Sequence, residues 1–189
     1  AVDADGNGNG LTTGLVTVQS TAVTGTYAQA AIALGASATG TKIAGMGAIN
    51  VTLDNGSGAA ANYSPTEINT IDGLTTGTIT ASTAAATMAL LTDAANGGTN
   101  GLDKLDNAHN ITIPAITTTT IVAGDLNKID AKTTVDLDVN AATTITGKYS
   151  DIAAAYASSS IKGLGNEAIT VNDGTVTVAE ANALNALTP

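Results

Sequence analysis

The feature that most constrains this chain is an internal repeat of about 59 residues, present three times in 189 residues. Two families of segments share the period. Glu-Ile-Asn-Thr-Ile-Asp, Asp-Leu-Asn-Lys-Ile-Asp and Glu-Ala-Asn-Ala-Leu-Asn begin at positions 67, 125 and 180. Ile-Ala-Gly-Met, Leu-Asp-Lys-Leu and Ile-Lys-Gly-Leu begin at positions 43, 102 and 161. Two interleaved families with one period indicate an array of similar units, each in contact with its neighbours.

Runs with an apolar residue at every second position predict strands with one buried face. Six such runs begin at Leu15, Ile49, Thr78, Ile111, Val135 and Ile169, so that long gaps of about 34 residues alternate with short gaps of about 24 to 29. A second Thr- and Val-rich run and a short helix usually follow each start. We therefore predict an α/β repeat solenoid of six coils, with parallel strands stacked from coil to coil and short helices between them. Residues 15–189 would form this single solenoid, and residues 1–14 a Gly/Asn/Asp-rich arm that ends a short coil.

Helix starts are also encoded in the sequence. Ser64, Pro65 and Glu67 supply an N-cap, a proline at the first helical position and a glutamate three residues after the cap. Residues 124–125 and 147–150 predict two further helix starts.

The composition suits a thin interior. Phe and Trp are absent and there are only 4 Tyr, whereas thick cores rely on aromatic side chains. Lys+Arg number 6 against 16 Asp+Glu, and this net charge of −10 argues against nucleic acid and anionic membrane surfaces as partners. No apolar run is long enough for membrane insertion, and the absence of cysteine excludes disulfides and thiolate sites.

The Ala/Thr/Gly/Asn/Asp-rich texture, with segments such as Glu-Ala-Asn-Ala-Leu-Asn-Ala-Leu-Thr at residues 180–188, resembles the repeat regions of large secreted surface proteins of bacteria, especially cyanobacteria. Such regions are often described as haemolysin-type or calcium-binding. The resemblance implies an extracellular or cell-surface location and a structural or adhesive role. The calcium-binding nonapeptide pattern Gly-Gly-x-Gly-x-Asp, common in such proteins, is absent from this chain.

A candidate metal site lies in the arm. Asp3, Asp5, Asn7 and Asn9 place oxygen side chains at alternate positions of a glycine-rich loop, where they can converge on Ca²⁺. The pattern matches the opening of an EF-hand loop, but Gly14 stands where the bidentate glutamate should be. The same arm can instead be solvated, or dock on a neighbouring chain. Calcium is therefore the one candidate cofactor.

Polar side chains form a second candidate surface. If the aliphatic residues of the first strands point inward, nine polar residues line one outer face: Thr17, Asn50, Thr52, Thr80, Thr112, Asp136, Asp138, Thr170 and Asn172. Such polar side chains can simply keep the surface of the strands hydrated. The face can also bind a glycan or, as a regular threonine grid, bind ice. Asn50, Pro114 and the two aspartates interrupt the grid.

No constellation of residues predicts catalysis. His109, the only histidine, lies in a bend and is interpreted as a solvated turn residue. Asp136 and Asp138 lie two residues apart on an exposed strand, with no pocket to adapt them for general-acid work. Asn55 is the most accessible of several N-glycosylation sequons. We therefore predict that the protein is not an enzyme.

The repeat favours assembly. A solenoid must shield its end coils or stack them on something. Neither end of the sequence resembles a cap, and the chain stops in the phase in which it starts, so a strand at Leu15 could follow the coil that starts at Ile169. We predict a structural extracellular or cell-surface repeat protein that self-associates head to tail through its end coils into a filament, or forms part of a longer surface array. The alternatives are a calcium- or glycan-binding adhesion module and an ice-binding solenoid.

Overall fold

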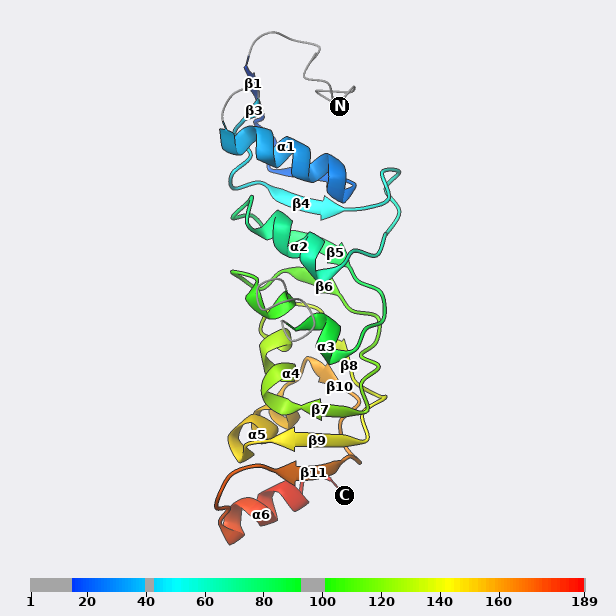
Figure 1. Ribbon diagram of the computed structural model, residues 1–189, viewed down its shortest axis with the longest axis vertical. Helices are drawn as coiled ribbons and strands as arrows, with labels where there is room; N and C mark the ends of the chain where they lie inside the picture. Colours follow the sequence, from blue (N-terminus) through cyan, green and yellow to red (C-terminus); the bar gives the residue numbers. More distant parts are fainter. Residues whose placement is uncertain (1–14, 40–42, 93–100, 189) are drawn as a thin grey trace.

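The computed structural model describes residues 15–39, 43–92 and 101–188. These residues form an elongated molecule in which short strands and helices succeed one another along the long axis (Figure 1). One end holds β1, β3 and α1, and the opposite end holds β11 and α6 (Figure 1). The named strands pair only in parallel.

The strands fall into four separate sheets, with strand orders β1-β3, β2-β4-β5-β6, β11-β9-β7 and β10-β8. The first two sheets contain β1 (Val16–Thr17), β2 (Ala22–Gly25), β3 (Ile43–Ala44), β4 (Asn50–Leu53), β5 (Ile79–Ser82) and β6 (Asn110–Thr112). The other two contain β7 (Thr120–Val122), β8 (Leu137–Asp138), β9 (Thr144–Gly147), β10 (Ile161–Lys162) and β11 (Ala168–Val171).

Six α-helices and one 3₁₀ helix separate the strands of the described residues. They are α1 (Tyr27–Thr39), α2 (Pro65–Asp72), α3 (Met88–Leu91), η1 (Leu102–Lys104), α4 (Ala123–Asp130), α5 (Tyr149–Ala157) and α6 (Val178–Asn185). In the part of the chain that the structure describes, no helix has the length and apolar character needed to cross a membrane.

The predicted capping box at the start of α2 is confirmed. The Ser64 hydroxyl accepts a hydrogen bond from the Glu67 N–H, and the Glu67 carboxylate accepts one from the Ser64 N–H. Thr177 and Glu180 make the same pair of bonds at the start of α6. These bonds satisfy backbone N–H groups that the first turn of a helix leaves unpaired.

Rows of aliphatic side chains build the core. Val23 pairs with Val51 in the next strand, and Ile121 pairs with Ile145, which in turn pairs with Ile169. The helices add fully buried residues to these rows: Leu34, Ile68, Leu126 and Ile152. The β-branched Val and Ile residues of the strands pack well on a pleated surface, and Leu and Ile side chains of the helices complete the layer.

The predicted six-coil solenoid is contradicted by the pairing of the strands. Only three of the six predicted strand runs, those that contain β4, β5 and β6, share a sheet. The run at Leu15 leads into β1, which pairs with β3, and the run at Val135 contains β8, which pairs with β10. The run at Ile169 lies in β11, which pairs with β9. The molecule is therefore a mixed α/β protein of several small parallel sheets.

The predicted alternation of long and short spacings is wrong as well. Paired residues lie 28 positions apart between β2 and β4, as in Ala22 and Asn50. They lie 24 positions apart between β9 and β11, as in Thr144 and Ala168. The physical reason is that alternation of apolar residues identifies a strand with one buried face but does not specify the strand with which it pairs.

Glycine explains why the three similar segments that begin at positions 43, 102 and 161 do not share one structure. Gly45 and Gly163 follow β3 and β10 with φ values of 88° and 94°. A side chain at either position would collide, in one case with the backbone of Val18 and in the other with Asn140. Lys104 occupies the corresponding position of the third family member, and that segment forms η1 instead of a strand.

Four segments nevertheless share one order of elements. Each has a two-residue strand, then a four-residue strand, then a helix: β1-β2-α1, β3-β4-α2, β8-β9-α5 and β10-β11-α6. The first of these, residues 16–39, is termed the N-terminal unit. The last, residues 161–185, is termed the C-terminal unit.

Candidate functional site

The sheet edge at β11 exposes part of the core. β11 is the last strand of its sheet, and no described strand pairs with its outer edge. Ile169 and Val171 of β11 are only half-buried, whereas Ile121 and Ile145, in the same row as Ile169, are 0% exposed. The buried aliphatic row therefore reaches solvent at this strand.

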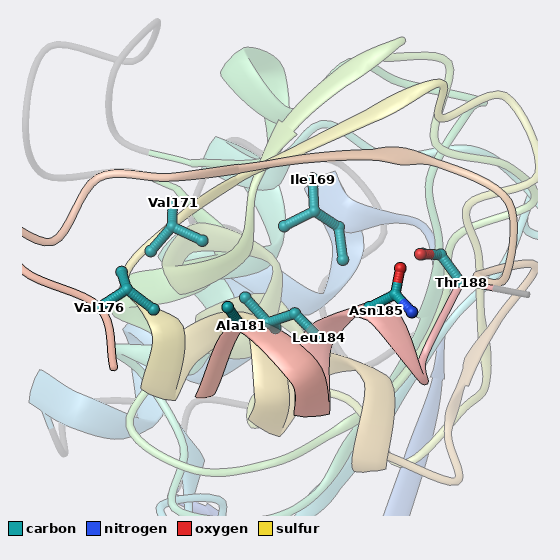
Figure 2. A pocket seen from close by; sticks show the side chains of 7 residues that line it. All are labelled: Ile169, Val171, Val176, Ala181, Leu184, Asn185 and Thr188. Atoms are coloured by element: carbon teal, nitrogen blue, oxygen red, sulfur yellow. The ribbon is translucent and has the colours of Figure 1, made fainter. Parts of the chain in front are cut away.

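An open cavity of about 400 Å³ lies between β11 and α6. Figure 2 shows side chains of β11 above it and side chains of α6 below it. Its lining consists of Ile169, Val171, Val176, Ala181, Leu184, Asn185 and Thr188. Five of these seven side chains are aliphatic and none is ionisable, so the cavity suits packing of an apolar partner better than acid–base chemistry.

Two carboxylates fix β11 against α5. Glu167, one residue before the strand, accepts hydrogen bonds of 2.7 Å from the Tyr156 hydroxyl and from the Gly165 N–H. Asp173, two residues after the strand, accepts a 2.7 Å bond from the Tyr149 N–H at the start of α5. Both ends of the edge strand are thereby held in place, which lowers the entropy cost of binding a partner.

The protonation states of this pair follow from its surroundings. Burial of Glu167 by itself would raise the pKa of its carboxyl, but hydrogen bonds from the Gly165 N–H and the Tyr156 hydroxyl outweigh burial and lower that pKa. Burial and the bond to Glu167 raise the pKa of Tyr156. Glu167 is therefore ionised and Tyr156 protonated at neutral pH, as their hydrogen bond requires.

The outer edges of β2 and β11 lack the residues that usually protect sheet edges. Exposed edges are commonly blocked by lysine, by proline or by inward-pointing charges. β2 reads Ala-Val-Thr-Gly and β11 reads Ala-Ile-Thr-Val, with neither charge nor proline. Among the described residues, no strand pairs with either of these two edges.

His109 forms a buried polar pair, so its interpretation as a solvated turn residue is wrong. The residue is 2% exposed, and its Nε2 lies 2.7 Å from Oδ1 of Asp72, which is 6% exposed. Its Nδ1 accepts a 3.2 Å bond from the Ile79 N–H, which assigns the ring proton to Nε2. The second oxygen of Asp72 accepts a bond from the Asp106 N–H at 2.8 Å. Because both ring nitrogens and both carboxylate oxygens are bonded within the protein, the pair is structural.

The predicted metal ligands Asp3, Asp5, Asn7 and Asn9 lie outside the described residues. Over residues 15–39, 43–92 and 101–188, no group of three or more His, Cys, Asp or Glu side chains is placed to hold a metal ion.

The two aspartates of the exposed strand do not meet. Asp136 lies 3.4 Å from the Lys162 ammonium, and Asp138 accepts bonds from the Asn140 backbone and side chain within its own turn. Each therefore has a local partner.

The nine polar residues predicted to point outward are all at least partly exposed. They do not form one face, because they lie in or beside strands of four different sheets. A continuous threonine grid is therefore not present among them.

No family model, no curated protein and no solved structure matches this chain. Its function is therefore inferred from its own fold and side chains.

Proposed function

We propose that this protein is a structural protein that associates with copies of itself end to end, through its open strand edges, into a filament or a longer surface array. The observation that carries the proposal is the edge of β11, where a buried aliphatic row reaches solvent without a charge or a proline to block it.

Burial of this edge provides the driving force. Moving a Val or Ile side chain from full exposure to full burial contributes roughly 1.5–3 kcal/mol. Ile169 and Val171 are already partly buried, so completing their burial contributes a fraction of this value, less than about 1 kcal/mol each. A partner strand would also pair the outward N–H and C=O groups of β11, as in other cases of strand addition.

Exposed hydrophobic residues at both ends support the same function. Among the described residues, large hydrophobic side chains are exposed at Leu15, Ile32, Leu90, Val122 and Val178. Three of these five lie in or beside the two end units: Leu15 precedes β1, Ile32 belongs to α1, and Val178 belongs to α6. An end-to-end contact can cover apolar surface from both partners.

We further propose that this assembly takes place outside the cell or at its surface. This location rests on the resemblance of the Ala/Thr/Gly/Asn/Asp-rich composition to secreted bacterial surface proteins.

Sedimentation velocity over a range of concentrations tests the proposal. The full chain is expected to form species larger than a monomer as its concentration rises. Val171→Lys places a charge on the open edge and should reduce this association by at least tenfold. Val122→Lys is the matched control, because Val122 is 47% exposed in β7, away from both ends, and this change should leave association intact.

Thermal melting of both variants shows whether each remains folded. A chain that stays monomeric up to millimolar concentration, or a Val171→Lys variant that is folded and associates as well as the unmodified chain, contradicts the proposed function.

A further inference from the structure

We infer that the edge of β11 pairs in parallel with the edge of β2 from a second copy, in the register that sets Ile169 beside Val23 and Thr170 beside Thr24. This inference rests on the proposed function and specifies its partner surface, polarity and register.

The hydrogen bonds between β11 and β9 show which backbone N–H and C=O groups of β11 face away from the sheet. The N–H groups of Ala168 and Asn172 donate to carbonyls at the two ends of β9. Because backbone groups alternate in direction along a strand, the N–H and C=O groups of Ile169 and Val171 face away from β9. These are the groups that a partner strand must match.

The backbone of β2 presents the complementary set. The carbonyls of Thr21 and Gly25 accept bonds from N–H groups in and just after β4. Ala22 and Thr24 therefore face away from β4. The Ser20 hydroxyl confirms this direction, because it bonds both to the N–H and to the C=O of Ala22, at 3.3 and 2.7 Å. Ser20 is exposed and can rotate away when a strand docks.

Matching these groups restricts the register. In the proposed contact the Ile169 N–H donates to the Ala22 carbonyl, and the Thr24 N–H donates to the Ile169 carbonyl. A shift by one residue would turn the open groups of one strand away from those of the other. Only shifts by two residues keep the backbone groups matched.

The pairing of side chains distinguishes among the registers that remain. Ile169 beside Val23 continues an aliphatic row, since Val23 already lies beside Val51 of β4. Thr170 beside Thr24 continues a row of threonines on the opposite face. A shift by two residues in either direction would set Ile169 beside Gly25 or Thr21, and the aliphatic row would be interrupted.

The short strands can pair in the same contact. Ile161 of β10 precedes Ala168 by seven residues, whereas Val16 of β1 precedes Ala22 by six. The molecule already accommodates this difference, because β3 and β4, whose starts are seven residues apart, pair with β1 and β2. β10 of one copy can therefore lie beside β1 of the next.

Charge favours a head-to-tail polarity over a tail-to-tail one. Residues 15–39 contain no charged side chain, whereas the C-terminal unit carries Glu167, Asp173 and Glu180 against one lysine. Two C-terminal units in contact would bring these carboxylates together, while the uncharged N-terminal unit meets them without repulsion.

Engineered cysteines test the register, because the chain has no cysteine of its own. The full-length variants Thr24→Cys and Thr170→Cys are mixed under mild oxidation, and disulfide-linked species are identified by non-reducing electrophoresis and mass spectrometry. A disulfide needs Cβ atoms within about 4.5 Å, whereas a register slip of two residues moves them about 6.6 Å apart along the strand. A mixture of Ala22→Cys with Thr170→Cys is the control for such a slip.

The expected result is a disulfide in the Thr24→Cys and Thr170→Cys mixture, at least fivefold more abundant than in the control mixture or in either variant alone. Association in sedimentation with disulfides mainly within the Thr170→Cys variant alone, or mainly in the control mixture, overturns this polarity or register and leaves the proposed function standing. Absence of both association and disulfides overturns the two together.

Discussion

At the scale of single residues, Asp72 and His109 connect parts of the chain that the sequence keeps far apart. Asp72 ends α2, Ile79 begins β5, and His109 immediately precedes β6. The carboxylate and the ring bond to each other and to backbone N–H groups of Ile79 and Asp106. Because both groups are buried away from water, their hydrogen bonds within the protein take the place of hydration. The loss of one partner therefore leaves the groups bonded to it unsatisfied.

His109→Ala is expected to lower the free energy of unfolding by about 3 kcal/mol, because it leaves Oδ1 of the buried Asp72 carboxylate and the Ile79 N–H without a partner. Lys128→Ala is the control: its ion pair with Asp125 is exposed, and its loss should cost less than about 0.5 kcal/mol. Urea denaturation followed by circular dichroism measures both. Equal effects of the two substitutions would show that the buried pair contributes no more than a surface pair.

This pair could not be predicted from the sequence. A lone histidine in a run of turn-forming residues has the composition of a solvated bend. Only the pairing of β5 with β6 brings that bend onto the end of α2. By contrast, the capping box at Ser64 is local, since its two residues lie three positions apart, and the sequence was sufficient to predict it.

At the scale of elements, α6 determines whether the cavity at β11 exists at all. The helix contributes three of the seven lining residues, and Leu184 is its buried anchor. Its start is held by Thr177 and Glu180. Hydrogen bonds from the N–H and hydroxyl of Thr177 lower the pKa of Glu180. Ionised Glu180 therefore stabilises the helix at neutral pH, and this contribution is lost as pH falls below the ordinary range of a glutamate.

Thr177→Ala should destabilise the start of α6 by about 1 kcal/mol, because it removes the hydroxyl that caps the Glu180 N–H. The protection of the α6 amides against hydrogen exchange should fall. Acidification should then lower this protection less in the variant than in the unmodified chain, because the Thr177 part of the cap is already lost. Ser64→Ala removes the same kind of cap from α2 and should leave exchange in α6 unchanged. Unaltered exchange in α6 of the Thr177→Ala variant would contradict this role of the cap.

The sequence predicts the positions of strands and helices better than it predicts which strands pair. The runs at Ile49, Thr78 and Ile111 do contain β4, β5 and β6 in one sheet, and helices do begin near the predicted starts. The pairings of β8 and β11 differ from the prediction because the Thr-rich run of β9, which follows the run at Val135, is the central strand of its sheet and pairs with β11. The cap at Thr177 has a Thr-x-x-Glu spacing that is visible in the sequence, so the local pattern is sufficient to predict it.

At the scale of the whole molecule, charge and apolar surface are distributed unequally. The chain carries a net charge of −10, yet residues 15–39 contain no charged side chain. Copies repel one another at long range, while the surfaces proposed to meet are mainly apolar and pair backbone groups. Two forces therefore act between copies. The electrostatic repulsion depends on ionic strength, whereas the attraction between apolar surfaces depends on it little.

Added salt is consequently expected to strengthen end-to-end association. The Debye length falls from about 30 Å at 0.01 M to about 10 Å at 0.1 M salt, which screens repulsion between acidic copies but leaves aliphatic burial intact. Sedimentation velocity at a fixed protein concentration should show larger species at the higher ionic strength, and the Val171→Lys variant should show little change. If salt instead dissolves the assembly of the unmodified chain, the contact depends on attraction between opposite charges, and the apolar edge of β11 is not what holds the copies together.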